Sequence, residues 1–395
     1  MFNEKTENII KTYLGILILF LLMAAVFDIA QKKGAYIKEE LPLKETPQDK
    51  TETTKNGAEN KIDETDETKK EETPTSSKKQ MELPAISTVF TPPPQIEKII
   101  QPTMPTVSKD IVSFEKINKS TRESLVNILC TTESSGSFSP ISGSGIIINE
   151  KGVILTNAHI AQYFLLRDYI KKDFVTCSIR MGSPSYPLYK AEPLYISEEW
   201  IINNYQNITQ QNYSENGESD YAFLLITETT NNENELPNKF PRVDYDVEEN
   251  TLEVGSNVLL GGYPAGFLGG ITIQKDLNIA TTIGQIKKLY TFSERTLDFI
   301  SLGGSVLAQK GSSGGAVMNN QNKLIGLIVT TTDSKLTQER DLGAITLAHI
   351  NRNLQKEIGL DIKTFLSFNL VETSKSFNKV KAPTLKNLLI TALEK

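Results

Sequence analysis

Short apolar runs separated by turn residues fill the chain from about residue 116 to residue 350. Runs such as GVILTNA, YAFLLIT and KLIGLIVTTT are rich in Ile, Val, Leu, Thr and Tyr and are bounded by Gly, Asn or Pro, a composition typical of β-strands. Helices that alternate with parallel strands would show longer segments of 3.6-residue periodicity. The pattern therefore predicts an all-β sandwich or a pair of barrels, and 116–355 is long enough for two six-stranded barrels.

The residues after this stretch change to helical patterns. NRNLQKEI, after Ile350, predicts a short helix. PTLKNLLITALEK places its leucines on one helical face, with Thr384 available as an N-cap. We expect 356–395 to form a helical extension that packs on its own domain.

The N-terminal part contains an uncharged stretch. Residues 12–27, TYLGILILFLLMAAVF, carry no charge and are flanked by Lys11 before and by Asp28, Lys32 and Lys33 after. As a helix they would span about 24 Å, and including Ile29 and Ala30 extends this to about 27 Å, just enough for a thin bilayer. A cleaved signal peptide lacks support because no A-x-A site follows the stretch, and no neighbouring domain is evident that would bury it as a soluble helix. We expect 1–30 to be a single membrane-spanning anchor; the balanced lysines leave its orientation open.

Residues 31–115 have the composition of a tether. Lys, Asp and Glu dominate the first part, and six prolines lie within 84–105. Such a segment buries too little apolar surface to offset its ordering entropy, and the prolines favour extended geometry. We expect a disordered linker between the anchor and the β-domain.

Composition limits the partners and cofactors. The net charge is −6, from 42 basic and 48 acidic residues, so a nucleic-acid partner is not expected. Two histidines and two cysteines cannot build a multi-histidine or four-cysteine metal centre, and we expect neither metal nor cofactor. Cys130 and Cys177 lie in strand-like runs, where buried free thiols are the expected state, and pairing between them stays open. His349, near the end of the β-region, is expected to be structural.

Three stretches carry catalytic chemistry. GVILTNAH ends on His159, DYAFLLI begins with Asp220, and GSSGGAV holds Ser313 between glycines. A serine hydroxyl is a weak nucleophile that needs an adjacent base, and the base needs a carboxylate to fix its tautomer. Glycines beside the serine allow the tight turn that directs two amides at an oxyanion. Each stretch alone is ordinary, but the three together indicate nucleophilic catalysis.

These stretches resemble those of the trypsin-like serine proteases. TNAH looks like their TAAH motif, DYAFLLI like their D-I-A-L-L strand, and GSSGGAV like their G-D-S-G-G loop; SGSGIIIN, GGYPAG and TTIGQI look most like the HtrA-type branch. The resemblance implies two six-stranded antiparallel barrels followed by a short C-terminal helix, with 116–355 as the protease domain. It also implies that His159 is the general base, Asp220 its orienting carboxylate and Ser313 the nucleophile. The amides of Gly311 and Ser313 would form the oxyanion hole.

Departures from the family pattern are also informative. Ser312 stands where digestive-type enzymes carry an aspartate, which HtrA-type members also lack, so this departure favours that branch. Too few residues follow 355 for a PDZ domain. The polar stretch 203–219 looks like an insertion at the cleft rim. We therefore expect a membrane-anchored serine endopeptidase that acts on polypeptides outside the cytoplasm, in quality control or processing. The alternative is a catalytically silent scaffold that binds peptides with the same fold.

The resemblance also places a specificity pocket. Leu307 falls where enzymes of basic specificity carry an aspartate, Val329, Thr330 and Thr331 would line the opposite wall, and Gly343 would leave the pocket open. No acid is available to pair with a buried Lys or Arg, which is costly to leave unpaired. A small or medium aliphatic side chain before the scissile bond is expected.

Overall fold

The structure is a computed structural model, and its described residues lie in one compact unit, Ser77–Lys395. They are 87–90, 112–132, 140–210, 212–215, 217–231, 234–292, 295–331 and 341–395. The expected anchor, 1–30, and most of the expected linker lie outside them. Within these ranges, no helix has both the length and the hydrophobicity that crossing a bilayer requires.

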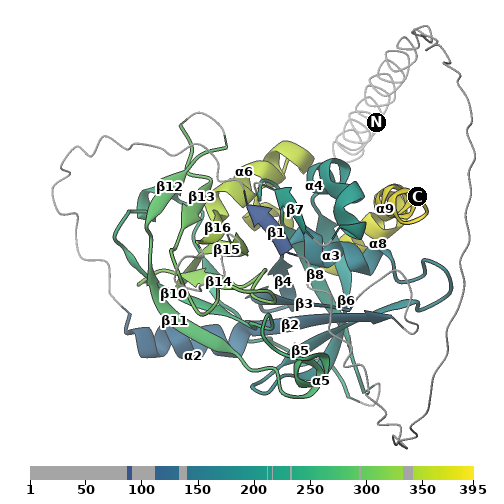
Figure 1. The fold of residues 1–395 in the computed structure, drawn as a ribbon, viewed down its shortest axis with the longest axis horizontal. Coiled ribbons are helices and arrows are strands. Elements are labelled where there is room, and N and C mark those ends of the chain that lie inside the picture. Colours follow the sequence, from purple (N-terminus) through teal and green to yellow (C-terminus); the bar gives the residue numbers. More distant parts are fainter. Residues whose placement is uncertain are drawn as a thin grey trace, which may run out of the picture. The chain divides into compact units, whose positions relative to one another are not determined.

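Six of the apolar runs close into an antiparallel barrel (Figure 1). The order around it is β2-β3-β4-β8-β6-β5. Its strands are β2 (Leu125–Thr132), β3 (Ile141–Asn149), β4 (Val153–Thr156), β5 (Val175–Met181), β6 (Tyr186–Ile196) and β8 (Ala222–Thr229). Nearly every residue of β2, β3 and β4 is buried, as expected where both faces of a strand are covered. The first predicted barrel is confirmed.

The prediction of a second closed barrel is wrong, because the second sheet stays open. Seven strands follow the order β11-β10-β14-β15-β16-β13-β12, and β9 pairs with β15. The two edge strands, β11 and β12, are separated only by Ile286 and Lys287, whose amides bond to the carbonyls of Ser256 and Ser301. The chain itself thus joins the two edges where a ladder would have closed the barrel. The strands are β9 (Asp244–Tyr245), β10 (Asn257–Gly262), β11 (Ala280–Gln285), β12 (Lys288–Tyr290), β13 (Phe299–Ser301), β14 (Ala316–Met318), β15 (Lys323–Thr331) and β16 (Leu342–Thr346).

The expectation of free thiols is also wrong. Cys130 on β2 and Cys177 on β5 stand directly opposite each other, with their Cα atoms 4.0 Å apart, and form a disulfide. The sequence showed both residues in strands, but only the register between the strands makes them neighbours.

Four helices end the chain, where the sequence predicted a helical extension with two helical segments, NRNLQKEI and PTLKNLLITALEK. They are α6 (Leu347–Ile358), α7 (Ile362–Ser367), α8 (Leu370–Val380) and α9 (Ala382–Leu393). Each break has a local cause: Gly359 ends α6 in the left-handed conformation (φ +76°), and Asp361 and Asn369 cap the next two helices. Helix α8 packs on β6 and β8, so the extension covers the first barrel.

Within the described ranges, four other α-helices connect the strands: α2 (Phe114–Ser124), α3 (Ala158–Leu165), α4 (Glu198–Asn204) and α5 (Gly270–Lys275). The polar stretch 203–219 contains the end of α4, the 3-10 helix η1 (Tyr205–Thr209) and a short strand, β7 (Asn212–Glu215). This strand pairs in parallel with β1 (Ser87–Phe90), which comes from the linker (Figure 1).

Candidate active site

His159 and Asp220 are in direct contact. Strand β4 ends at Thr156 and α3 begins at Ala158, so His159 lies in the first turn of that helix. Its Nδ1 lies 2.7 Å from Oδ2 of Asp220, and its backbone amide donates to Oδ1 of the same carboxylate at 3.0 Å. Asp220 is fully buried, and His159 is 7 % exposed. The carboxylate therefore fixes both the ring and the backbone of the histidine.

Asn157, two residues before His159 in the TNAH motif, adds a second link. Asn157 precedes α3, and its side-chain amide donates to the backbone carbonyl of Asp220 at 2.9 Å. Asp220 is thus hydrogen-bonded to the start of α3 by the Asn157 side chain and by the His159 backbone amide. Asn157 was part of the TNAH motif, but its contact was not predicted.

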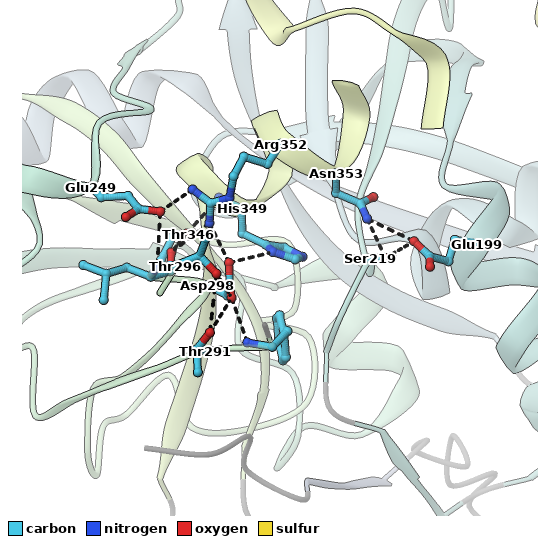
Figure 2. Close-up of polar contacts among 12 residues, drawn as sticks. Glu199, Ser219, Glu249, Thr291, Thr296, Asp298, Thr346, His349, Arg352 and Asn353 are labelled. Carbon is cyan, nitrogen blue, oxygen red and sulfur yellow. Dashed lines mark hydrogen bonds and ion pairs between the residues drawn. The ribbon is translucent and has the colours of Figure 1, made fainter. Parts of the chain in front are cut away.

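The turn before Asp220 is supported from helix α6. Ser219 has a left-handed backbone (φ +60°), which is uncommon outside glycine. Its hydroxyl donates to Glu199 Oε2 at 3.1 Å, and the side-chain amide of Asn353 donates to that hydroxyl at 3.0 Å and to Glu199 Oε2 at 3.1 Å (Figure 2). Burial alone would raise the pKa of Glu199, but the hydrogen bonds from Lys356, Asn353 and Ser219 outweigh it and lower the pKa. The ionised carboxylate thereby holds the turn.

Glu357, four residues further along α6, is bonded to the start of α4. Its carboxylate accepts hydrogen bonds from the hydroxyls of Tyr195 at 2.6 Å and Ser197 at 2.7 Å and from the Glu198 amide at 2.9 Å. Burial and the nearby charge of Glu357 raise the pKa of Tyr195 far above its usual range. The ring of Trp200, in α4, lies 6.4 Å from that of His159. Helix α6 thus contacts both the turn before Asp220 and the start of the helix that carries Trp200.

A second histidine anchors the start of α6. His349 Nδ1 lies 3.1 Å from Oδ1 of Asp298. The Arg352 guanidinium donates hydrogen bonds to the same oxygen and to the Glu249 carboxylate (Figure 2). Burial alone would raise the pKa of Asp298, but the hydrogen bonds from His349 and Thr296 outweigh it and hold the pKa far below its usual range. The cluster fixes α6 to β13 in the second sheet.

The Ser313 turn is attached to the first barrel. Ser144 of β3 donates its amide to the Ser313 carbonyl at 2.7 Å. Gly314 has φ +84°, and a Cβ there would lie 1.9 Å from the Ser144 carbonyl oxygen and 2.7 Å from Oγ1 of Thr156. Only glycine permits this approach. The turn therefore lies beside Thr156, three residues before His159.

The turn directs the Gly311 amide away from Ala265. The Lys310 carbonyl accepts the Ala265 amide at 2.7 Å. In a trans peptide the N–H and C=O point in opposite directions, so the N–H of Gly311 points away from Ala265. The hydroxyl of Ser144 donates to the Gly311 carbonyl at 2.7 Å and fixes the next peptide as well.

The Ser313 amide is oriented in the same way. The Ser312 carbonyl accepts the Gly315 amide at 2.9 Å, so the N–H of Ser313 points away from that bond. Within the described ranges, neither the Gly311 nor the Ser313 amide has an acceptor in the chain. The two amides the sequence predicted as an oxyanion hole are thus available as donors.

The Ser313 hydroxyl donates to a carbonyl of the second sheet. Its acceptor is the backbone oxygen of Val329 in β15, at 3.2 Å. Val329 is fully buried. The serine is thus positioned between the first barrel, through Ser144, and strand β15.

The residues of the predicted specificity pocket lie on β15, on β16 and in the hydrophobic core of the second sheet. Leu307 is fully buried in the core of the second sheet. A Cβ on Gly343 would come 2.1 Å from Cζ of Phe299, so that ring occupies the space in front of the glycine. The backbones of Thr330 and Thr331 pair with β16, and their side chains lie outside the described part. The assignment of these residues to a pocket stays a prediction.

Comparisons with known proteins complete the description. Residues 143–327 match the sequence model of the trypsin-like peptidase domain. The structure of a protein named Deg5 aligns with a TM-score of 0.39 at 16% identity, covering 60% of this chain and 90% of Deg5. The active form of the Rv3671c protease from M. tuberculosis aligns with a TM-score of 0.39 at 14% identity, covering 66% of this chain and 95% of the other. No curated protein matches the sequence significantly.

Proposed function

Residues 143–327 are a trypsin-like peptidase domain, and from this premise we propose that the chain is a serine endopeptidase. In this proposal it hydrolyses polypeptides through Ser313, His159 and Asp220. The observation that supports it best is the 2.7 Å contact between Nδ1 of His159 and Oδ2 of Asp220. No cofactor takes part.

The carboxylate determines which nitrogen acts as the base. An ionised Asp220 only accepts hydrogen bonds, so the proton of the neutral imidazole resides on Nδ1 of His159. Nε2 then carries the lone pair that accepts the Ser313 proton. The negative charge beside Nδ1 stabilises the imidazolium that results.

The Ser313 hydroxyl must rotate before it reacts. Its single proton is donated to the Val329 carbonyl in this structure, so it cannot be donated to His159 at the same time. After rotation, Oγ bonds to the substrate carbonyl carbon while the proton passes to Nε2. The oxyanion that forms is bound by the amides of Gly311 and Ser313.

The intermediate then collapses in two stages. The carbon–nitrogen bond breaks and His159 returns its proton to the leaving amine, which leaves an ester on Ser313. Water, deprotonated by His159, attacks that ester, and the released Ser313 recovers the proton. The net reaction consumes one water per peptide bond.

The membrane and the compartment are part of the proposal. The uncharged stretch 12–27 supports an anchor, and the charged, proline-rich residues 31–115 support a tether. The motifs SGSGIIIN, GGYPAG and TTIGQI support a role like that of HtrA-type proteases, in quality control or processing outside the cytoplasm.

A fluorophosphonate probe tests the proposal. The probe should label the full chain on Ser313, and Ser313→Ala should abolish labelling. Ser312→Ala is the matched control because Ser312 is the neighbouring serine, buried and without a hydroxyl partner in the described part; this variant should label normally. A chain that folds but takes no label would show that the site is not catalytic, which favours a peptide-binding scaffold.

A further inference from the structure

A short strand of the linker lies against the candidate active site. β1 pairs in parallel with β7, with Ser87 opposite Asn212 and Phe90 opposite Glu215. The same strand also lies against β15 (Figure 1). Further along the chain, just before α2, the Val112 amide donates to the carbonyl of Asn320, between β14 and β15 of the second sheet, at 2.9 Å.

Both elements that β1 contacts lead directly to the site. β7 ends at Glu215, just before the turn that carries Asp220. β15 contains Val329, whose carbonyl accepts the Ser313 hydroxyl. Gly217, between β7 and Asp220, lies beside β15, because a Cβ there would be 3.6 Å from Cγ2 of Val329. β1 thus runs between the loop of the carboxylate and the strand beside the nucleophile.

An extended peptide at a sheet edge binds mainly through its backbone. Such strand addition accepts many sequences because the N–H and C=O groups supply the contacts. An endopeptidase that acts on polypeptides needs this kind of contact beside its nucleophile. We propose that the surface formed by β7 and β15 binds extended peptides and that residues 87–90 are its resident occupant, which a substrate must displace. This inference rests on the proposed function.

The linker sequence allows β1 to occupy the surface and still be displaced by a substrate. Residues 91–111 connect β1 to the domain, so β1 competes with a separate peptide as an intramolecular ligand. Pro92, Pro93 and Pro94 have no N–H, so they cannot continue a ladder as donors beyond Thr91. The occupant is therefore a short strand, held weakly enough for a substrate to compete.

Competition of this kind has a kinetic signature. A substrate that must displace a resident strand shows a raised apparent KM, while kcat is unchanged once the site is saturated. A fractional occupancy of about 70–90% would raise KM by about 3- to 10-fold.

The test uses the full chain with Thr88→Pro and Val89→Pro combined. One of these two residues directs its N–H toward β7, since alternate residues do so in a parallel ladder, and proline removes that donor. For an unstructured peptide substrate, KM should fall about 3- to 10-fold with kcat unchanged. Ile96→Pro with Glu97→Pro, in the same linker but outside β1, is the matched control and should leave KM unaltered. Thr88→Gly with Val89→Gly gives a second variant that keeps every N–H but lowers strand propensity.

A binding measurement separates this inference from the proposed function. A fluorescent peptide of residues 84–91 should bind the Ser313→Ala chain about 3- to 10-fold more tightly when β1 carries the two prolines, whether or not the enzyme cleaves anything. A scrambled peptide serves as the control. Equal affinity for both chains, or an unchanged KM in both β1 variants, would overturn the resident-strand proposal. Loss of fluorophosphonate labelling with the affinity difference retained would overturn only the proposed function.

Discussion

The side-chain amide of Asn353 donates to the hydroxyl of Ser219 at 3.0 Å, and this bond connects the C-terminal helix α6 to the residue before Asp220. Because Ser219 has a positive φ, the turn needs outside support to keep Asp220 against His159. Asn353 is therefore a positioning residue that acts through the turn.

Replacing Asn353 by leucine should reduce kcat about 3- to 30-fold with little change in KM. The substitution leaves the Ser219 hydroxyl without its donor and lets the Asp220 turn move, at a cost of about 1–3 kcal/mol in unfolding free energy. Steady-state kinetics and thermal unfolding measure both effects. Lys356→Ala is the control, because it lies on the same helix and contacts the same Glu199 but is largely exposed. A purely structural role would lower the melting temperature and leave kcat per folded molecule unchanged.

Ser144 should control the oxyanion hole from the other barrel. Its hydroxyl donates to the Gly311 carbonyl at 2.7 Å and accepts the Tyr263 amide at 2.9 Å. Ser144→Ala frees the Gly311 peptide to rotate, and loss of one aligned oxyanion donor costs about 10²- to 10³-fold in kcat; we expect about 10- to 100-fold because rotation is partial. Ser142→Ala, on the same strand, is the control. Equal kcat for both variants would exclude the role assigned to Ser144.

Gly314→Ala should abolish activity and destabilise the fold. The added Cβ would meet the Ser144 carbonyl at 1.9 Å in a left-handed backbone (φ +84°), so the turn cannot stay in place. Gly255→Ala separates the two causes, because Gly255 has φ +92° with nothing within 4 Å of the added Cβ. That control should lose only about 1 kcal/mol through backbone strain. Chemical denaturation and peptide hydrolysis of both variants provide the comparison.

Asp298 should make stability sensitive to acid. Its folded pKa is held below the ordinary value of 3.8, so its contribution is fully present above that value and is lost as the pH falls through the folded pKa. Wild-type protein should lose more unfolding free energy between pH 4 and pH 2 than Asp298→Asn does, while at pH 7 the variant should be less stable by about 1.5–3 kcal/mol. Asp244→Asn, whose side chain is 68% exposed, should follow the wild-type curve. Parallel curves for wild type and Asp298→Asn would contradict this view of the cluster.

The local motifs predicted the strands and the residues at their ends well. TNAH and DYAFLLI are short motifs that each contain one predicted catalytic residue, and the structure places these two residues, His159 and Asp220, in contact. Chain features that depend on distant partners were not predictable. The Cys130–Cys177 pair depends on the register of β2 against β5, and the open second sheet depends on how β11 turns into β12.

The contact of α6 with the turn before Asp220 was not predictable for the same reason. Asn353 lies 134 residues after Ser219, and no local pattern in NRNLQKEI links it to the Asp220 turn. Asn157 did carry a signal, since it stands where the family motif TAAH has an alanine. A polar residue at a buried motif position indicates a hydrogen-bond partner, which is here the Asp220 carbonyl.

The most direct measurement of the central claim is a double-mutant cycle on kcat/KM for one unstructured peptide, with His159→Ala, Ser313→Ala and the two combined in the full chain. If the two side chains act as one catalytic unit, each single variant and the double variant should lose a similar factor, on the order of 10⁴ or more. Losses that multiply in the double variant, or wild-type rates in Ser313→Ala, would contradict the account.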